Sequence, residues 1–461
     1  MILPFAYFVN FFSLFANTQS FSMIYMNFNS EKQLNFTVFH LVRLKKRVAT
    51  IMTMQKKIKE RGKKMKLLST IRVKLLYIVS DRLKLPPTET LEGDGACKRI
   101  GDYCKKKGYT HALIITDKEI MKLDIPCNML DSLKQAGIAY TIYDGVLPNP
   151  TLRMSQEASM MGKKNKADII IAFGGGSSID CAKLTAAAIT NTKPIKKLIG
   201  ILKVRKEPVP IIAVPTTAGT GSEISVGAVI SDDATHKKSL MISPKIVPAL
   251  AVLDGRTMVG LPPYLTAITG FDALTHAVEA FIGRHRHQEG KAHAKQAVVG
   301  IYRHLKRAFD TGSDIEARSA LSLASYHAGK AMNKCGLGYA HAFGHRLTEF
   351  YDLPHGLAVG MVLPHVLDMS RKESQKSLSE LAIACKLGDA SEPERHLAEK
   401  FISWVSGLYR ECGLPQKVDK LSRSDYHLII KEAFQEADAT YPVPRYFTKN
   451  DAYDLLDRLS P

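Results

Sequence analysis

Cysteine is sparse in this sequence, with seven residues in 461, and no two of them form a Cys-x-x-Cys pair. An odd, dispersed set argues against a disulfide framework and favours a reducing compartment. The apolar stretch 1–16 is interrupted by Pro4, Asn10 and Ser13, and it is shorter than the ~20 apolar residues of a spanning helix. Because the first lysine is Lys32, the positively charged start of a secretory signal peptide is lacking too. We therefore expect a cytoplasmic protein.

Positive charge, by contrast, is in excess, and most of it lies in one N-terminal segment. The formal net charge is +20. Residues 43–74 contain thirteen Lys or Arg and one acid, a net charge of +12, so the rest of the chain carries about +8. No aromatic residue interleaves the basic stretch 56–66, and no known nucleic-acid module follows it. We therefore expect no nucleic-acid partner.

Three interpretations of this basic segment stay open. It is a disordered extension, or the translation start is a later methionine, at Met52, Met54 or Met65. Alternatively, residues 63–76, which mix Lys and Arg with Leu, Ile and Val, form a helix that contacts a membrane surface. In each case residues 1–75 are an extension outside the enzyme body.

Short apolar runs alternate with helix-length amphipathic segments over residues 76–260. The runs are 111–116, 139–143, 168–173, 210–214 and 250–253, and the helical segments include 129–136 and 154–164. This alternation predicts a mostly parallel sheet that is covered by helices on both faces. The length of the chain, well above the ~150 residues of one typical domain, allows a second domain.

The pattern of apolar residues changes at Leu261-Pro262-Pro263. From there to Pro461, apolar residues recur at helical spacing and strand-like runs are almost absent. Examples are 265–282, 294–309, 316–332 and 394–408. We therefore predict an α/β domain over residues 76–260 and an all-α domain over residues 261–461.

A glycine-rich turn follows the third apolar run. The segment Gly174-Gly175-Gly176-Ser177 precedes a helix that we expect to begin at Ser178 or Ile179. Glycines let backbone N–H groups approach a pyrophosphate closely, and the helix N-terminus adds partial positive charge. Asp180 and Lys183 on the first turn are expected to orient this loop. A tight turn without a ligand is the alternative, because the segment is not a G-x-G-x-x-G fingerprint.

A second polar loop follows the fourth apolar run. Residues 215–223 are dense in hydroxyls and glycines, and they leave the sheet at the same carboxyl edge, where open α/β sheets bind ligands. Asp117 ends the first run at this edge. Its carboxylate would accept from both ribose hydroxyls of adenosine and repel a 2′-phosphate, which favours NAD over NADP. A helix N-cap is the alternative role for Asp117.

One aspartate and three histidines have the spacing of a metal site. Asp272 and His276 lie four residues apart, on one face of a predicted helix. His341 and His355 lie fourteen apart, and His355 follows Pro354, at a turn or a helix start. One carboxylate with three imidazoles suits Fe²⁺ or Zn²⁺.

These motifs resemble the iron-containing (group III) alcohol dehydrogenases, over about residues 75–461. The resemblance rests on five collinear motifs: Pro148 to Thr151, Gly174 to Asp180, Pro215 to Glu223, Gly270 to Glu279, and His341 to Gly356. It implies a Rossmann-like N-terminal domain and a helical C-terminal domain, the dehydroquinate synthase-like fold, with the active site between them.

The resemblance also implies roles for individual residues. Asp272, His276, His341 and His355 would bind the metal, and His345 would lie near the nicotinamide and the substrate as a catalytic residue. The expected cofactor contacts are Asp117, Gly175, Gly176, Ser177, Asp180, Thr216, Thr217, Ser222 and Lys238.

The implied activity is reversible, NAD(H)-linked oxidation of a primary or secondary alcohol, with Fe²⁺ or Zn²⁺ bound, in a homodimer. The alternative is a glycerol dehydrogenase-like or other polyol dehydrogenase of the same superfamily, although such relatives typically use three protein ligands. Near His345 the chain departs from many members: Arg346, Thr348 and Glu349 stand in place of a Gln- and Gly-rich stretch, and Gly344 in place of Ala.

Overall fold

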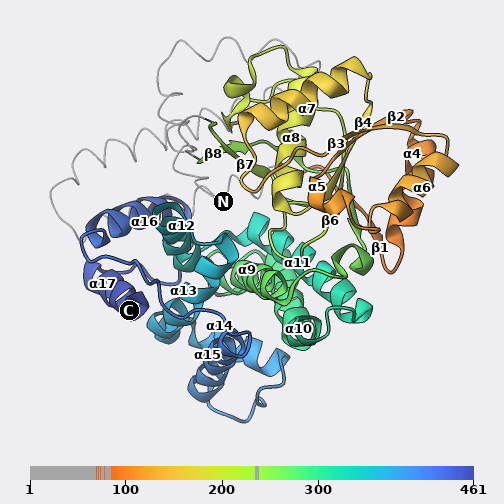
Figure 1. The fold of residues 1–461 in the computed structure, drawn as a ribbon. Coiled ribbons are helices and arrows are strands. Elements are labelled where there is room, and N and C mark those ends of the chain that lie inside the picture. The colour runs from red at the N-terminus through yellow and green to blue at the C-terminus, as the bar shows by residue number, and fades with distance from the viewer. Residues whose placement is uncertain (1–68, 70, 72, 74–76, 78–84, 234–237) are drawn as a thin grey trace, which may run out of the picture.

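The structure, a computed structural model, describes residues 69, 71, 73, 77, 85–233 and 238–461. Figure 1 shows two parts, one in which helices surround strands and one that is built of helices. The interpretations of segment 1–75 concern positions that lie almost wholly outside the described residues. Within the described part, no helix is long and apolar enough to cross a membrane.

Six parallel strands form the main sheet. In spatial order they are β1 (Glu89–Glu92), β9 (Leu250–Leu253), β6 (Ile211–Pro215), β4 (Ile169–Gly174), β2 (His111–Ile115) and β3 (Ala139–Tyr143). All five predicted strands are present. The four inner strands are buried along nearly their whole length, which explains their continuous apolar sequence.

The sequence did not predict the edge strand β1, whose Glu-Thr-Leu-Glu sequence is half exposed. It also did not predict a small second sheet in the order β5 (Gly200–Ile201), β8 (Lys238–Ile242) and β7 (Gly227–Ser231). This sheet lies beside the main one, and β7 packs against helix α8 (Gly176–Thr190).

Helices cover both faces of the main sheet, as predicted. Ile169 and Ile171 of β4 belong to one core cluster, with α4 (Ile100–Lys107) and α6 (Cys127–Gln135). Ile170 and Ala172 belong to the opposite cluster, with α7 (Leu152–Lys164) and α8. Alternate side chains of one strand therefore point into two cores. A short helix, α5 (Lys118–Met121), follows β2.

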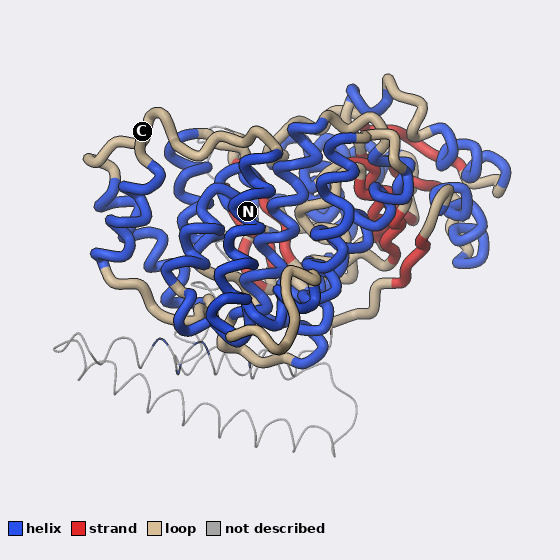
Figure 2. Tube along the Cα trace, turned by 90° about the horizontal axis from the view of Figure 1, so that it is seen from below, coloured by secondary structure: helices blue, strands red, loops and turns tan. Residues whose placement is uncertain are grey.

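The second part of the chain is helical (Figure 2). Its helices are α9 (Pro263–Ile282), α10 (Gln288–Asp310), α11 (Ile315–Cys335), α12 (Tyr339–Tyr351), α13 (His355–Met369), α14 (Arg371–Ala384), α15 (Glu394–Glu411), α16 (Tyr426–Thr440) and α17 (Lys449–Leu459). The short 3-10 helices of the chain are η1 (Ala96–Arg99), η2 (Ile195–Leu198), η3 (Pro244–Ile246) and η4 (Gly255–Met258). The α/β and all-α classes are thus confirmed, while the exact domain boundaries stay a prediction.

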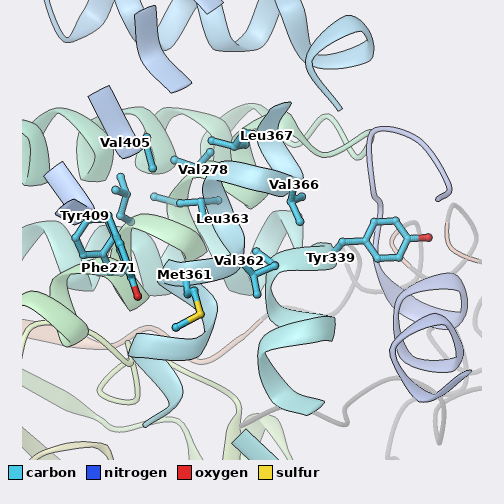
Figure 3. Close-up of a cluster of buried hydrophobic side chains, with 14 of the residues drawn as sticks. Phe271, Val278, Tyr339, Met361, Val362, Leu363, Val366, Leu367, Val405 and Tyr409 are labelled. Atoms are coloured by element: carbon cyan, nitrogen blue, oxygen red, sulfur yellow. The ribbon is translucent and has the colours of Figure 1, made fainter. Parts of the chain in front are cut away.

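Helix α9 lies at the centre of the helical domain and packs against α10, α11 and α13. From Thr266 onward nearly every residue of α9 is buried, so apolar residues occur on all its faces. Figure 3 shows Phe271 and Val278 of α9 among side chains of α13 and α15. The Phe271 ring meets that of Tyr409 edge to face, with centroids 5.0 Å apart. This buried helix carries two of the predicted metal ligands.

Candidate metal and cofactor site

Three helices bring the four predicted metal ligands together. Asp272 and His276 lie on α9, His341 on α12, and His355 is the first residue of α13. From Asp272 Oδ1, the Nε2 atoms of His355, His341 and His276 lie 3.2, 3.7 and 3.8 Å away. Ligand atoms of Asp272, His276 and His341 all lie within 4.8 Å of one another. One ion can therefore reach Asp272, His276 and His341, and His355 Nε2 lies against the same Asp272 oxygen.

The chain reaches this arrangement through a tight connection between α12 and α13. Asp352 ends α12 in the left-handed conformation, with φ of 53°, and Pro354 precedes the first turn of α13. At Gly356 a Cβ atom would lie 2.1 Å from the Ile268 carbonyl oxygen of α9. Only glycine lets the start of α13 approach α9 so closely, which places His355 over Asp272.

The four ligand side chains are short of hydrogen-bond partners. Within the described part of the chain, Asp272 Oδ1, His341 Nε2 and both ring nitrogens of His276 and His355 are buried without a hydrogen bond. Buried polar atoms normally have partners, so this concentration of unsatisfied atoms at one point fits a bound cation. The donor set, one carboxylate and three imidazoles, suits iron or zinc.

The electrostatics of the site also favour a cation. Burial lowers the pKa of His276 to about 3 and that of His355 to about 4, which leaves both imidazoles neutral and able to bind a metal. Burial opposes ionisation of Asp272, yet the imidazoles around it hold the pKa of Asp272 well below its usual value. The carboxylate is thus negatively charged at neutral pH.

Glu279, which the sequence analysis did not assign, orients one of these ligands. It lies two turns beyond Asp272 on α9 and is buried. His341 Nδ1 donates to Glu279 Oε2 at 2.7 Å, and the backbone N–H groups of Gly338 and Ala340 donate to the same carboxylate at 2.8 and 2.6 Å. Burial opposes a charge on His341, but the carboxylates of Asp272 and Glu279 outweigh it and raise the pKa of His341 to about 9. Nδ1 is thereby held as the donor, and Nε2 faces Asp272.

His345 lies one turn beyond His341 on α12, and its ring stacks on that of His355, with centroids 5.2 Å apart. Its Nδ1 donates to Glu436 Oε1 of α16 at 2.7 Å, while its Nε2 is buried without a hydrogen bond within the described residues. Burial keeps the pKa of His345 well below its usual value and raises that of Glu436 to about 8. Sequence reasoning found His345 but not Glu436.

Arg346, one of the departures noted in the sequence, lies beside this pair. Its guanidinium lies 2.9 Å from Glu432, 2.8 Å from Glu349 and 3.5 Å from Glu436. The side chain is therefore engaged by three carboxylates and is nearly buried. It lies against Glu436, the partner of His345.

The glycine-rich turn has the geometry of a phosphate-binding loop. Helix α8 begins at Gly176, with Gly175 as its N-cap, two residues earlier than the expected start at Ser178. Gly174 has φ of 156°, and a Cβ atom there would lie 2.4 Å from Ser178 Oγ. The chain therefore needs glycine to turn from β4 directly into the helix, and this turn exposes the first N–H groups of α8.

The second loop lies against the first, at the carboxyl edge where both were predicted to leave the sheet. A Cβ atom on Gly175 would lie 3.5 Å from Thr217 Oγ1, and one on Gly176 would lie 2.8 Å from Thr220 Cγ2. The same loop reaches the helical domain, where a Cβ on Gly219 would lie 2.8 Å from Thr269 of α9. The loop thus links the glycine-rich turn to the helix that carries Asp272 and His276.

Asp180 and Lys183 support these loops from within the protein. Asp180 Oδ2 accepts from the N–H of Val229 at 2.9 Å. The Lys183 ammonium donates to the carbonyl and hydroxyl of Ser225, both at 2.9 Å, and to the Gly227 carbonyl at 2.8 Å. Both side chains are buried, so the structure gives Asp180 contacts that hold α8 to β7 rather than an exposed position in the loop.

The remaining predicted cofactor residues lie around the same edge. Thr216 and Ser222 are buried in the second loop, and Ser177 lies in the first turn of α8. Asp117 follows β2 and caps α5, since its Oδ1 accepts from Ile120 N–H at 2.9 Å. The capping alternative therefore holds, and it leaves the second carboxylate oxygen available. Lys238 begins β8, and burial lowers its pKa.

Known protein families match the α/β part and the helical part of the chain separately. Residues 87–255 match the family described as iron-containing alcohol dehydrogenase, and residues 266–460 match the Fe-containing alcohol dehydrogenase family, C-terminal. The chain belongs to the iron-containing alcohol dehydrogenase family. It is therefore an oxidoreductase, and the resemblance seen in its motifs is confirmed.

Individual relatives of this iron-containing alcohol dehydrogenase support the assignment. Alcohol dehydrogenase 4 of Schizosaccharomyces pombe is 36% identical over 360 residues, which cover 77% of this chain and 84% of that protein. The NAD-dependent methanol dehydrogenase of Bacillus methanolicus is 32% identical over 374 residues, 81% of this chain and 98% of that protein. The crystal structure of a 1,3-propanediol oxidoreductase superposes with a TM-score of 0.77 at 32% identity, covering 81% of this chain and 98% of that one.

Proposed function

We propose that this dehydrogenase catalyses the reversible, NAD(H)-linked oxidation of a small primary or secondary alcohol to an aldehyde or ketone. The observation that carries the proposal is the convergence of Asp272, His276, His341 and His355 beside two loops suited to a dinucleotide. The relatives above are named for an alcohol, for methanol and for 1,3-propanediol. We therefore place small alcohols and diols first among the substrates.

Asp272, His276, His341 and His355 would hold the metal, and we infer Fe²⁺ from the family description, with Zn²⁺ as the other ion that suits these donors. When bound, such a cation would polarise the substrate oxygen and lower the pKa of its hydroxyl, an effect that takes the pKa of metal-bound water from ~15.7 to ~7. Glu279 contributes by fixing the orientation of His341.

Gly175, Gly176 and Ser177 would bind the pyrophosphate through the N-terminus of α8. Thr216, Thr217 and Ser222 would line the cofactor cleft, with Lys238 as a further contact. The carboxylate of Asp117 would accept from the adenosine ribose and disfavour a 2′-phosphate, which is why we propose NAD rather than NADP. Asp180 acts behind these groups by tying α8 to β7.

His345 is the residue that we propose to accept the alcohol proton. Its Nδ1 is committed to Glu436, so its Nε2 is the nitrogen available for proton transfer. Burial keeps this imidazole neutral at neutral pH, which is the protonation state a base needs. A positioned base of this kind accounts for roughly 10²–10⁴-fold in rate.

Anaerobic purification with metal analysis, followed by an NAD(H) absorbance assay over a panel of alcohols and aldehydes, tests the proposal. We expect about one iron or zinc per chain and turnover of at least one small alcohol with NAD. Metal-free protein that oxidises alcohols equally well would contradict the ligand assignment. Turnover confined to NADP would contradict the role of Asp117.

A further inference from the structure

A second functional surface is suggested by where the positive charge of the folded enzyme lies. Residues 160–207 contain ten Lys or Arg and three acids, a net charge of +7 out of the approximately +8 outside the N-terminal basic segment. The acids do little to offset it at the surface. Asp180 is buried, Asp168 accepts hydrogen bonds from the neighbouring backbone, and Glu207 is paired with Lys245.

Nine of these cations are exposed, and together we call them the basic edge: Lys163, Lys164, Lys166, Lys193, Lys196, Lys197, Lys203, Arg205 and Lys206. Only Lys196 has an ion pair within the described residues, with Asp232. Ordinary protein surfaces intersperse charges of both signs, so a one-sign cluster of this size creates a strong local potential.

Packing within the α/β domain places the basic edge on one surface. Gly162 near the end of α7 abuts Ile189 near the end of α8, where an added Cβ would lie 2.7 Å from the Ile189 side chain. Directly after α8, the side chain of Asn191 accepts from the backbone N–H groups of Arg205 and Lys206. The ends of both helices and segment 193–206 therefore meet at the amino edge of the sheet.

The cofactor loops leave the sheet at the opposite, carboxyl edge. The basic edge is therefore separate from the catalytic cleft. In Figure 1, α7 lies at the far end of the α/β domain from the helical domain. The charge of the basic edge is not needed to hold the nucleotide, and a ligand bound at the basic edge would leave the catalytic cleft open.

Two large apolar side chains project from the basic edge. Leu202 is 41% exposed and lies between η2 and the cations Lys203 and Arg205. Its φ of 54° is unfavourable for leucine, and its N–H donates to the Ile242 carbonyl at 2.8 Å, so the chain holds it in this turn. Met160 is 63% exposed and lies three and four residues before Lys163 and Lys164, on the same face of α7.

We propose that the basic edge docks the enzyme on an anionic lipid bilayer, with Leu202 and Met160 entering the headgroup region. Cations attract the negative surface of such a membrane, and apolar tips among them gain by partial burial in it. A surface for single-stranded nucleic acid would instead use aromatic side chains on which bases stack, and Phe173, the one aromatic residue of segment 160–207, is buried. A bilayer thus fits both the charge and the apolar tips.

Vesicle co-sedimentation of the full chain tests the proposal. We expect binding to vesicles of phosphatidylcholine with phosphatidylserine, little binding to phosphatidylcholine alone, and release as salt shortens the screening length from about 10 Å at 0.1 M to about 3 Å at 1 M. Replacing Lys193, Lys197, Lys203 and Arg205 by Gln removes four exposed cations. Since each contributes about fivefold in affinity near the surface, we expect at least a tenfold loss.

The matched control replaces four exposed lysines of the helical domain by Gln: Lys372, Lys376, Lys417 and Lys420. This variant has the same net charge as the basic-edge variant, and we expect it to bind vesicles nearly as well as the unchanged chain. Equal losses in the two variants would overturn the proposal, because they would reflect total charge alone. So would a basic-edge variant that retains full vesicle binding but loses binding to a 20-base oligonucleotide.

An environment-sensitive fluorophore locates the contact directly. It would be attached to Leu202→Cys in a chain that also carries Cys127→Ser, which removes the exposed native thiol. The control site is Leu428→Cys on α16, because Leu428 has the same 41% exposure. We expect a blue shift with anionic vesicles at position 202 and not at 428. No shift at 202, or equal shifts at both sites, would refute docking through the basic edge.

Discussion

Replacing Glu279 by Gln tests a residue that orients a proposed metal ligand, without changing any of the ligands themselves. The change keeps the size of the side chain and removes its charge. Glu279 accepts from His341 Nδ1 and from two backbone N–H groups, all within 2.8 Å. Oε2 accepts from His341 and Gly338, and Oε1 accepts from Ala340, whereas the Gln amide has a single acceptor oxygen, so at least one of the three bonds is lost. Hydrogen bonds to a charged acceptor contribute about 1.5–3 kcal/mol, against about 0.5–1.5 for neutral ones, so one lost and two weakened bonds cost roughly 3.5–6 kcal/mol.

Part of this cost should appear in metal binding. Partners of metal-ligating histidines typically change metal affinity by about 10–100-fold when they are mutated. We expect Glu279→Gln to lower the affinity for Fe²⁺ or Zn²⁺ within that range, and the metal-free protein to unfold at a lower temperature. Glu279→Ala would be a harsher change, because it leaves three buried N–H groups without an acceptor, those of His341 Nδ1, Gly338 and Ala340, at about 1–3 kcal/mol each.

Competition with a chelator measures the metal affinity, and calorimetry of the metal-free protein measures the stability. Glu380→Gln is the control, because Glu380 is an exposed glutamate of α14, away from the ligands. If Glu279→Gln loses stability but binds metal as tightly as the unchanged chain, Glu279 is only a structural acceptor. The reasoning about the orientation of His341 would then be refuted.

Three further outcomes are expected. His276→Ala should abolish metal binding and turnover while circular dichroism stays unchanged; retained iron or zinc would remove His276 from the ligand set. Asp117→Gly should raise the use of NADP relative to NAD, and an unchanged ratio of the two kcat/KM values would exclude Asp117 from cofactor selection. Asp451 has its pKa lowered to about 2, against the opposing effect of burial, by its arginine partner and by Thr448 at the start of α17. Because the pKa is lower in the folded state, the stabilisation is full above about pH 4 and is lost toward pH 2. Asp451→Asn should therefore lower the unfolding free energy by about 1–2 kcal/mol at pH 7, and this difference should shrink on acidification.

The sequence predicted those parts of the fold whose signal is local. Buried inner strands such as β4 must be apolar on both faces, so short apolar runs identified them. The edge strand β1 contacts a neighbour on one side only and tolerates two glutamates, which hid it. Similarly, the spacing of Asp272 and His276 predicted a shared helix face before any helix was seen.

Tertiary contacts between distant residues left no such signal. Glu436 meets His345 across 91 positions of sequence, and nothing near either residue indicates the contact. Glu279 is different, because it lies seven residues beyond Asp272, two turns along the same face of α9. A carboxylate on the ligand-bearing face of a predicted helix therefore indicated a residue of the metal site, and the sequence analysis did not use this signal.

Two histidines one turn apart on α12 illustrate how the fold gives one residue type two tasks. His341 and His345 each donate from Nδ1 to a buried carboxylate, Glu279 for the first and Glu436 for the second. Only His341 Nε2 also faces the Asp272 carboxylate, at 3.7 Å. The pKa of His341 is accordingly raised and that of His345 is lowered by burial. A cation would take the place of the proton on His341, whereas His345, which does not face Asp272, keeps the role of proton acceptor that we propose.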